Sequence, residues 1–157
     1  MTAMEESKKE NIYISLIKEI KALTDGESDL IANLSNISAA LKRAFDFYSW
    51  TGFYFLKNEE LVLGPFQGNP ACIRIKLGKG VCGICAAEKK AMIVGDVTKF
   101  PGHIACDADT KSEIVIPILK DGELKAVLDI DSYEKGSFSE IDEKHLKEVS
   151  EICSNLF

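Results

Sequence analysis

The sequence predicts an α+β fold in which helices pack on a mainly antiparallel central sheet. Apolar residues recur at helical spacing at both ends of the chain, and alternating or aromatic β-prone runs lie between them. Short turns connect several of these runs as hairpins, and no strand–helix–strand unit repeats. The length of 157 residues suits one domain, which we expect to span residues 1–157.

Two helices are expected within residues 1–47. The first has apolar residues at helical spacing over 13–23, and Asp25-Gly26 ends it. Ser28 is expected to cap the second, whose apolar stripe spans residues 30–45. Both stripes are most simply core or interface faces, and the first helix could instead form the contact of a homodimer.

Residues 48–157 are expected to contain the sheet, a long loop and a C-terminal helix. Ser139 opens that helix, with Asp142 as its capping-box partner. The other expected elements are strands at 50–56, 61–63, 73–77, 91–94, 113–118 and 124–131, a loop at 64–70, a short helix at 81–89 and an irregular segment at 95–110. A loop as long as the last one is usually functional or disordered in a compact domain.

Charge and hydropathy exclude several classes of partner. The formal net charge is −6 and the chain has no basic run, so we expect no nucleic-acid or anionic-membrane binding. No apolar stretch approaches the roughly 20 residues that span a bilayer. The first residues contain no apolar segment typical of a signal peptide, so we expect a cytoplasmic location.

Five cysteines without a secretory signal point to redox chemistry or metal binding. Cys82-x-x-Cys85 follows a Gly-rich turn, and Cys82 is expected near a helix N-terminus, where the helix dipole lowers the pKa of a thiol. The alternative is that both are small buried hydrophobes. Cys106 lies in the long loop near His103, which could lower the pKa of the thiol or bond the loop backbone. Together the two motifs could also form a Cys₃His zinc site.

Cys72 opens the strand expected at 73–77. Because strand side chains alternate, it should share the polar face with Arg74 and Lys76, beside cations that favour a thiolate. The alternative is an exposed, unreactive thiol. Cys153 lies on the apolar face of the last helix and is expected in the core.

Acidic and aromatic residues form two further candidate groups. Glu113 begins one strand, and Asp129 and Asp131 end the next, pointing to the same face. Paired carboxylates are costly unless they are solvated, paired or bound to a cation, and an exposed sheet edge is the alternative. Trp50 and Tyr54 share a strand face, where a core position is the more common role.

Several of these segments, in this order and at these intervals, resemble the free methionine-(R)-sulfoxide reductases, which are single GAF-domain enzymes. The resemblance covers most of the chain from about Trp50 onward. The matching segments are Trp50-Thr51-Gly52-Phe53-Tyr54, Gly64-Pro65-Phe66-Gln67-Gly68, Ala71-Cys72-Ile73-Arg74-Ile75, Gly78-Lys79-Gly80-Val81-Cys82-Gly83, Asp96-Val97, Gly102-His103-Ile104-Ala105-Cys106-Asp107, Ser112-Glu113-Ile114-Val115-Ile116-Pro117 and Leu128-Asp129-Ile130-Asp131-Ser132.

The resemblance implies a GAF-like fold and a role for each candidate. Cys106 corresponds to the catalytic nucleophile, Cys72 to the main resolving cysteine, and Cys82 to a third cysteine that resolves or relays. The resemblance implies that the main route of the reaction forms a disulfide between Cys72 and Cys106. Trp50 and Tyr54 correspond to walls of the pocket around the methyl sulfoxide.

The same resemblance assigns the acidic residues to the substrate. Glu113, Asp129 and Asp131 would hold the small zwitterion and its sulfoxide oxygen. Glu113 is our candidate proton donor, because like charges keep one carboxylic acid neutral. Cys85 is extra by comparison with the family pattern and is a minor candidate as a resolving thiol.

The implied reaction reduces free L-methionine-(R)-sulfoxide through a cysteine sulfenic acid and a disulfide. Thioredoxin or a similar dithiol reductant would restore the thiols, and neither a metal nor an organic cofactor is needed. The alternative function is a non-catalytic GAF module that senses a small ligand or forms dimers.

Overall fold

The computed structural model describes residues 2–157. Its elements are α1 (Ala3–Thr24), α2 (Leu30–Ala44), β1 (Trp50–Lys57), β2 (Glu60–Gln67), β3 (Arg74–Lys76), α3 (Gly80–Glu88), β4 (Met92–Val94), the 3₁₀ helix η1 (Val97–Lys99), β5 (Ser112–Lys120), β6 (Glu123–Ser132) and α4 (Glu140–Ser154). The strands form one antiparallel sheet in the order β3-β2-β1-β6-β5-β4. The predicted α+β class is confirmed.

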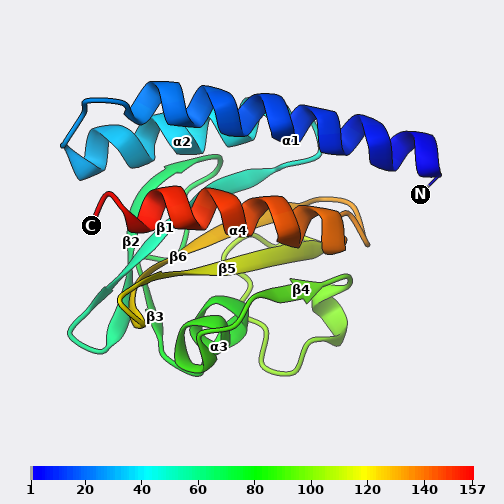
Figure 1. Ribbon diagram of the computed structural model, residues 1–157. Coiled ribbons are helices and arrows are strands. Elements are labelled where there is room, and N and C mark those ends of the chain that lie inside the picture. Colours follow the sequence, from blue (N-terminus) through cyan, green and yellow to red (C-terminus); the bar gives the residue numbers. More distant parts are fainter. Residues whose placement is uncertain (1) are drawn as a thin grey trace.

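Helices cover both faces of the sheet (Figure 1). One core joins α1, α2 and α4 to inward side chains of β1, β5 and β6. A second, smaller core lies under α3 on the opposite face. Because side chains alternate along a strand, Leu128 and Ile130 of β6 face the first core, whereas Val127 faces the second. Asp129 and Asp131 therefore point to the α3 face.

Two tight turns build the predicted hairpins. Asn58 and Glu59 connect β1 to β2, and both have positive φ angles, of 50° and 63°. Asp121 and Gly122 connect β5 to β6 in the same way, with φ angles of 52° and 77°. Two-residue turns with positive φ match the right-handed twist of the paired strands, so these turns fix the register of both hairpins.

The loop predicted at 64–70 is wrong in its first half, because residues 64–67 continue β2. Gly52 pairs with Phe66 and Tyr54 with Leu63, so two residues of β2 face one residue of β1 in a bulge. A bulge leaves a backbone N–H unpaired, which is why Pro65 fits within this strand.

The predicted cap of the second helix is also wrong. Helix α2 begins at Leu30, and Asp29 is its N-cap: its carboxylate accepts a hydrogen bond from the backbone N–H of Ala32 at 2.8 Å. Ser28 lies one residue too early for this role. Asp and Ser cap helices about equally well, so residue type could not distinguish Asp29 from Ser28. The cap is Asp29 because it directly precedes the first helical residue, Leu30.

A buried polar cluster joins α1 to α4. Lys9 contacts Asp142 at 2.5 Å, and the Tyr13 hydroxyl donates to the same carboxylate at 2.6 Å. The hydroxyls of Tyr13 and Tyr48 lie 2.5 Å apart. Asp142 also accepts from the backbone N–H of Ser139 at 2.8 Å, so the predicted capping box is present.

None of the described helices is long and apolar enough to cross a membrane.

Candidate active site

A pocket opens on the α3 face, where the sheet, the start of α3 and the loop of residues 100–111 meet. All predicted site residues except Cys72 line it: Trp50, Tyr54, Cys82, Cys106, Glu113, Asp129 and Asp131. The loop is anchored at its end, because the N–H of Lys111 donates to the carbonyl of Ser132 at 2.8 Å. Side chains from widely separated parts of the sequence thus share one cavity.

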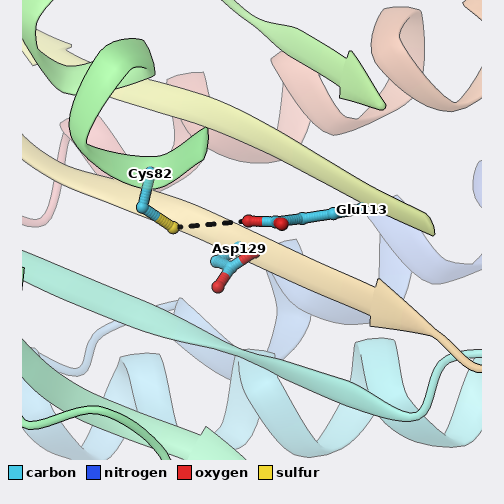
Figure 2. Close-up of side chains that lie close together, drawn as sticks. All are labelled: Cys82, Glu113 and Asp129. Atoms are coloured by element: carbon cyan, nitrogen blue, oxygen red, sulfur yellow. Dashed lines mark hydrogen bonds between the residues drawn. The ribbon is translucent and has the colours of Figure 1, made fainter. Parts of the chain in front are cut away.

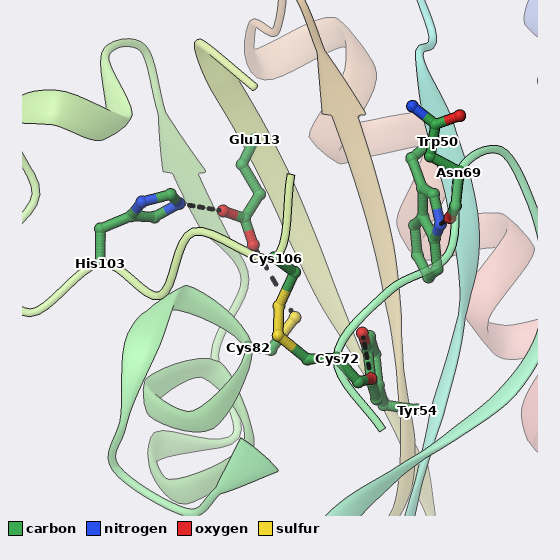
Figure 3. Close-up of a disulfide and its surroundings, with 8 residues drawn as sticks. All are labelled: Trp50, Tyr54, Asn69, Cys72, Cys82, His103, Cys106 and Glu113. Carbon is green, nitrogen blue, oxygen red and sulfur yellow. Dashed lines mark hydrogen bonds and ion pairs between the residues drawn. A yellow bond between two sulfur atoms is a disulfide. The ribbon is translucent and has the colours of Figure 1, made fainter. Parts of the chain in front are cut away.

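Cys72 and Cys106 form a disulfide beside this pocket (Figure 3). Their Cα atoms are 5.3 Å apart although 34 positions separate them in the sequence. The pairing implied by the family resemblance is therefore present. The bond ties the pocket loop to the segment that enters β3.

The predicted surroundings of Cys72 need correction. Strand β3 begins at Arg74, so strand alternation does not extend back to Cys72. Ile73 is 69% exposed, whereas Cys72 is half-buried and packs against the smaller core. The Arg74 guanidinium pairs with Glu60 instead of activating a thiol.

Cys82 remains a free thiol at the third position of α3. Its Sγ donates to Glu113 Oε1 at 3.8 Å (Figure 2). Burial first, and then the nearby carboxyl groups of Asp129 and Glu113, raise the pKa of this thiol well above its ordinary value. The prediction that the helix N-terminus lowers it is wrong, since desolvation and neighbouring acids outweigh the dipole.

The zinc site considered from the sequence is not assembled. Cys106 is in a disulfide, and the Sγ of Cys85 lies 3.7 Å from the backbone carbonyl of Val115. Burial raises the pKa of Cys85. The expected core position of Cys153 is confirmed: it is fully buried in the larger core, which raises its pKa to about 12.

Three acidic side chains converge on the pocket from β5 and β6. Glu113 pairs with Asp131 across the strands, and Asp129 lies two residues away on the same face. Burial is the main cause that raises the pKa of each carboxyl group well above its ordinary value, and a neighbouring carboxylate adds to it. Because β6 lies between β1 and β5, the alternative of an exposed sheet edge is excluded.

The acids and Cys82 form a compact group. Single ligand atoms of Cys82, Glu113 and Asp129 all lie within 4.8 Å of one another (Figure 2). Such a group can share a small cation or hold protons, and the raised pKa values favour protons. Asp129 Oδ1 is buried and has no hydrogen-bond partner within residues 2–157. A carboxylic acid that stays neutral near pH 7 can donate a proton to a reacting oxygen.

His103 contacts Glu113, a pairing that the sequence did not predict. Its Nε2 lies 3.5 Å from Glu113 Oε2 (Figure 3). Burial lowers the pKa of the imidazole, so the ring is neutral near pH 7. From the sequence, Cys106 was the expected neighbour of His103, because the two are three positions apart. The contact with Glu113 of β5 could not be predicted, because it arises only when the loop packs against the folded sheet.

Trp50 and Tyr54 form an aromatic wall of the pocket. Their rings stack at 5.9 Å, as the shared strand face predicts. The indole Nε1 of Trp50 donates to the carbonyl of Asn69 at 3.0 Å, and the Tyr54 hydroxyl donates to the carbonyl of Cys72 at 3.0 Å. Both rings are thus fixed to the segment that carries the disulfide.

A polar bridge at the pocket rim was also not predicted. Tyr133 donates to Asp107 at 2.8 Å, and the Asn69 amide donates to the same carboxylate at 3.3 Å. Hydrogen bonds, led by one from the backbone N–H of Asp109, lower the pKa of Asp107. The loop is therefore tied to the end of β6 and to the segment before Cys72 by side chains as well as by the disulfide.

Comparison with known proteins identifies relatives over nearly the whole chain. The GAF domain family matches residues 28–157. GAF domain-containing protein A of Dictyostelium discoideum is 51% identical, covering 94% of this chain and 93% of that protein. Free methionine-R-sulfoxide reductase of Escherichia coli is 44% identical, covering 90% of this chain and 86% of that protein.

A solved structure agrees with these relatives. The X-ray structure of free methionine-R-sulfoxide reductase from Neisseria meningitidis, in complex with its substrate, has a TM-score of 0.93 and 42% identity, covering 95% of this chain and 90% of that chain. The fold, the disulfide beside an acid-lined pocket and the extent of these matches lead to one assignment. This chain belongs to the GAF-domain family of free methionine-(R)-sulfoxide reductases.

Proposed function

We propose that this protein reduces free L-methionine-(R)-sulfoxide to methionine, with Cys106 as the nucleophile. The observation that carries the proposal is the Cys72–Cys106 disulfide, whose Cys106 half lines a pocket of buried acids. A disulfide at that position is the product expected when a sulfoxide has been reduced by two thiols.

In the first step, the thiolate of reduced Cys106 attacks the sulfoxide sulfur. The oxygen takes a proton from Glu113, its bond to the methionine sulfur breaks, and the hydroxyl group passes to the Cys106 sulfur as methionine leaves. Cys106 becomes a sulfenic acid. The raised pKa of Glu113 supports its role as the donor, because the carboxylic acid is protonated near neutral pH.

In the second step, the Cys72 thiol attacks the Cys106 sulfur and water leaves. Two thiols with Cα atoms 5.3 Å apart meet the geometry that a disulfide needs. A dithiol reductant of the thioredoxin type then supplies two electrons and two protons, and returns both cysteines to thiols.

Binding of the substrate is assigned to the remaining predicted residues. Trp50 and Tyr54 would pack against the methyl sulfoxide end, and Asp129 and Asp131 would hold the ammonium group. A nearby ammonium group favours the charged form of a carboxyl group, so binding of the substrate would ionise Asp129 or Asp131. A free amino acid carries that ammonium group and a peptide-bound residue does not, which favours a free substrate.

Cys82 fits a supporting role better than a resolving one. Its pKa is raised and its S–H points to Glu113, so it remains protonated and hydrogen-bonded to the acid. The existing bond between Cys72 and Cys106 supports Cys72 as the resolving thiol.

The whole chain is proposed to act as one domain. Helix α1 precedes the matched residues 28–157, but its buried face and the contact of Lys9 with Asp142 join it to the larger core. A homodimer and a cytoplasmic location stay predictions.

An assay with resolved epimers tests this function. Thioredoxin, its NADPH-dependent reductase and free methionine sulfoxide are combined with the wild type and with Cys106→Ser, Cys72→Ser and Cys85→Ser. We expect NADPH oxidation with the (R) epimer, none with Cys106→Ser, and a near wild-type rate with Cys85→Ser, the matched control on α3.

Three outcomes would contradict parts of the proposal. Turnover of the (S) epimer alone would refute the assignment, and equal turnover of N-acetylmethionine sulfoxide would refute a free substrate. A ligand-sensing module would bind the sulfoxide without consuming it, in the wild type and in Cys106→Ser alike.

A further inference from the structure

Glu113 needs a new proton after each sulfoxide oxygen has left, and its surroundings restrict where that proton enters. Only 7% of the Glu113 side chain is exposed. The thiol of Cys82 lies on one side, and Asp129 and Asp131 of β6 lie on the same sheet face. Cys82 and Asp129 are buried and Asp131 is half-buried, and burial raises the pKa of all three, so before substrate binds they are already protonated at neutral pH and cannot take up a proton from solvent.

His103 provides a different contact to Glu113. It lies just after the turn at Pro101-Gly102, and its backbone N–H donates to the carbonyl of Phe100 at 3.2 Å. Its side chain is 15% exposed, about twice the fraction of Glu113, and its Nε2 is 3.5 Å from Glu113 Oε2. Within residues 2–157, Glu113 is the one ion-pair partner of the ring. Nε2 therefore faces the acid, and part of the side chain is reached by solvent.

An imidazole suits a proton relay because one nitrogen can accept a proton while the other donates one. The titratable and charged groups that line the pocket around this pair are Tyr54 of β1, Lys79 and Cys82 of the α3 start, Cys106 and Asp107 of the loop, and Asp129 and Asp131 of β6. Among these neighbours no other side chain is partly exposed, in direct contact with Glu113, and of a type whose unperturbed pKa lies near neutrality.

We propose that His103 is a positioning residue that acts through Glu113 by relaying a proton to it in each turnover. A proton from solvent binds the outer ring nitrogen, the N–H bond at Nε2 breaks, and the proton passes to the Glu113 carboxylate. The ring then returns to its first tautomer by exchange with solvent, and no electrons are transferred. This inference rests on the proposed role of Glu113.

A comparison of the first turnover with later ones isolates the relay. Fully reduced protein is mixed with free L-methionine-(R)-sulfoxide and saturating thioredoxin, and methionine is followed by rapid quenching. In His103→Gln, Glu113 starts protonated but is reprotonated slowly. We therefore expect the first methionine at close to the wild-type rate and later ones about tenfold more slowly or worse.

Asp109→Asn is the matched control, since Asp109 is an exposed residue of the same loop outside the pocket lining. We expect the wild-type rate in every turnover of this variant. A first turnover as slow as the later ones in His103→Gln would indicate a structural role and overturn the relay. Later turnovers at the wild-type rate would overturn it as well.

Chemical rescue separates relay from structure. We expect the later turnovers of His103→Ala to be slow and to recover most of their rate when free imidazole is added, in proportion to the imidazole concentration. A slow His103→Ala that imidazole does not accelerate would overturn the inference. A wild type that forms no methionine would instead overturn the proposed function, so the two failures are distinguishable.

Discussion

Glu113 has an unfavourable position for a carboxylate and a suitable one for a carboxylic acid. It is buried, faces Asp131 across two paired strands, and receives the S–H of Cys82. A solvent-exposed glutamate would lose its proton well below pH 7, whereas burial and the like charge raise the pKa of this one and keep it protonated. The same surroundings that destabilise the charged form thus supply the proton that sulfoxide reduction requires.

Replacing this acid with an isosteric amide tests its role. We expect Glu113→Gln to reduce the single-turnover rate of methionine formation by about 10²-fold or more, because an amide fills the space but donates no proton to the leaving oxygen. Glu60→Gln, at the Arg74 pair near the sheet edge, is the control and should react normally. Equal rates in the two variants would show that another group donates the proton.

The buried acids should also make stability depend on pH. Their folded-state pKa values are raised, so the folded protein holds protons that the unfolded chain releases as pH rises above the ordinary values of 3.8 for Asp and 4.5 for Glu. The free energy of unfolding therefore falls from about pH 4 upward until these groups ionise in the folded state. Each group that keeps its proton contributes a slope of about 1.4 kcal/mol for a one-unit rise in pH.

Asp129→Asn removes one of these groups. We expect the variant to gain thermal stability relative to the wild type at pH 8 and to gain little at pH 4, as measured by thermal unfolding of the disulfide-bonded protein at both values. Asp121→Asn, in the exposed turn between β5 and β6, is the control. A stability difference that does not change with pH would contradict the assignment of Asp129 as a protonated acid.

At the level of elements, α1 contacts α4 through a buried Lys9–Asp142 pair and through Glu10, which is exposed and lies near both Lys144 and His145 Nε2. Lys9 and Asp142 are almost completely buried, whereas Lys144 and Glu10 meet in solvent at 2.9 Å. Removal of one partner from a buried pair leaves an uncompensated charge, whereas a surface pair contributes little. The two pairs join the same two helices and therefore form a matched comparison.

Truncating one cation of each pair tests how α1 is held. We expect Lys9→Met to lower the free energy of unfolding by about 2–4 kcal/mol, because Asp142 loses its cation while keeping its hydrogen bonds to Tyr13 and Ser139. Lys144→Met should lower it much less, because a pair in solvent contributes little. Denaturant unfolding of both variants measures the difference. Similar losses in the two would mean that burial of the Lys9 pair adds nothing to the attachment of α1.

Much of the element order was predictable, and the errors have identifiable causes. Alternation placed Asp129 and Asp131 on one face, and helical spacing placed Cys153 in the core. The bulge around Pro65 was missed because it depends on the register of β1 against β2. The pKa of Cys82 was predicted in the wrong direction because the helix dipole is local information, whereas the acids that oppose it come from other strands.

The candidate site was predictable mainly through the family resemblance. Residues alone indicated reactive thiols and paired acids, but they did not determine which cysteines join. The contact of His103 with Glu113 and the bridge from Asn69 to Asp107 depend on where the loop folds back onto the sheet. Side chains that meet only through tertiary packing leave no local signal in one sequence.

At the scale of the molecule, the sheet separates the larger hydrophobic core on one face from the pocket on the other. The larger core under α1, α2 and α4 contains none of the pocket-lining residues, and the pocket lies on the opposite face with α3 (Figure 1). The disulfide and two side-chain hydrogen bonds hold the loop of residues 100–111 over that pocket. Reduction of the disulfide should therefore affect the face of the sheet that carries the pocket and leave the face covered by α1, α2 and α4 unchanged.

Hydrogen exchange of the oxidised and dithiol-reduced protein measures this separation. We expect amides of residues 100–111 and of the segment before β3 to exchange faster after reduction, because a covalent constraint has been removed. Amides in α1 and α4 should exchange at the same rate in both states. Faster exchange spread evenly over the whole chain would show that the disulfide supports the global fold and not only the pocket.

One measurement tests the central claim most directly. The fully reduced protein is mixed with excess free L-methionine-(R)-sulfoxide without any reductant, and methionine and disulfide-linked peptides are quantified in the same sample. We expect one methionine per chain, together with a Cys72–Cys106 disulfide formed at the same rate as the loss of the two thiols. Methionine formed while Cys106 remains a free thiol, or no methionine from a correctly folded and fully reduced protein, would contradict the account.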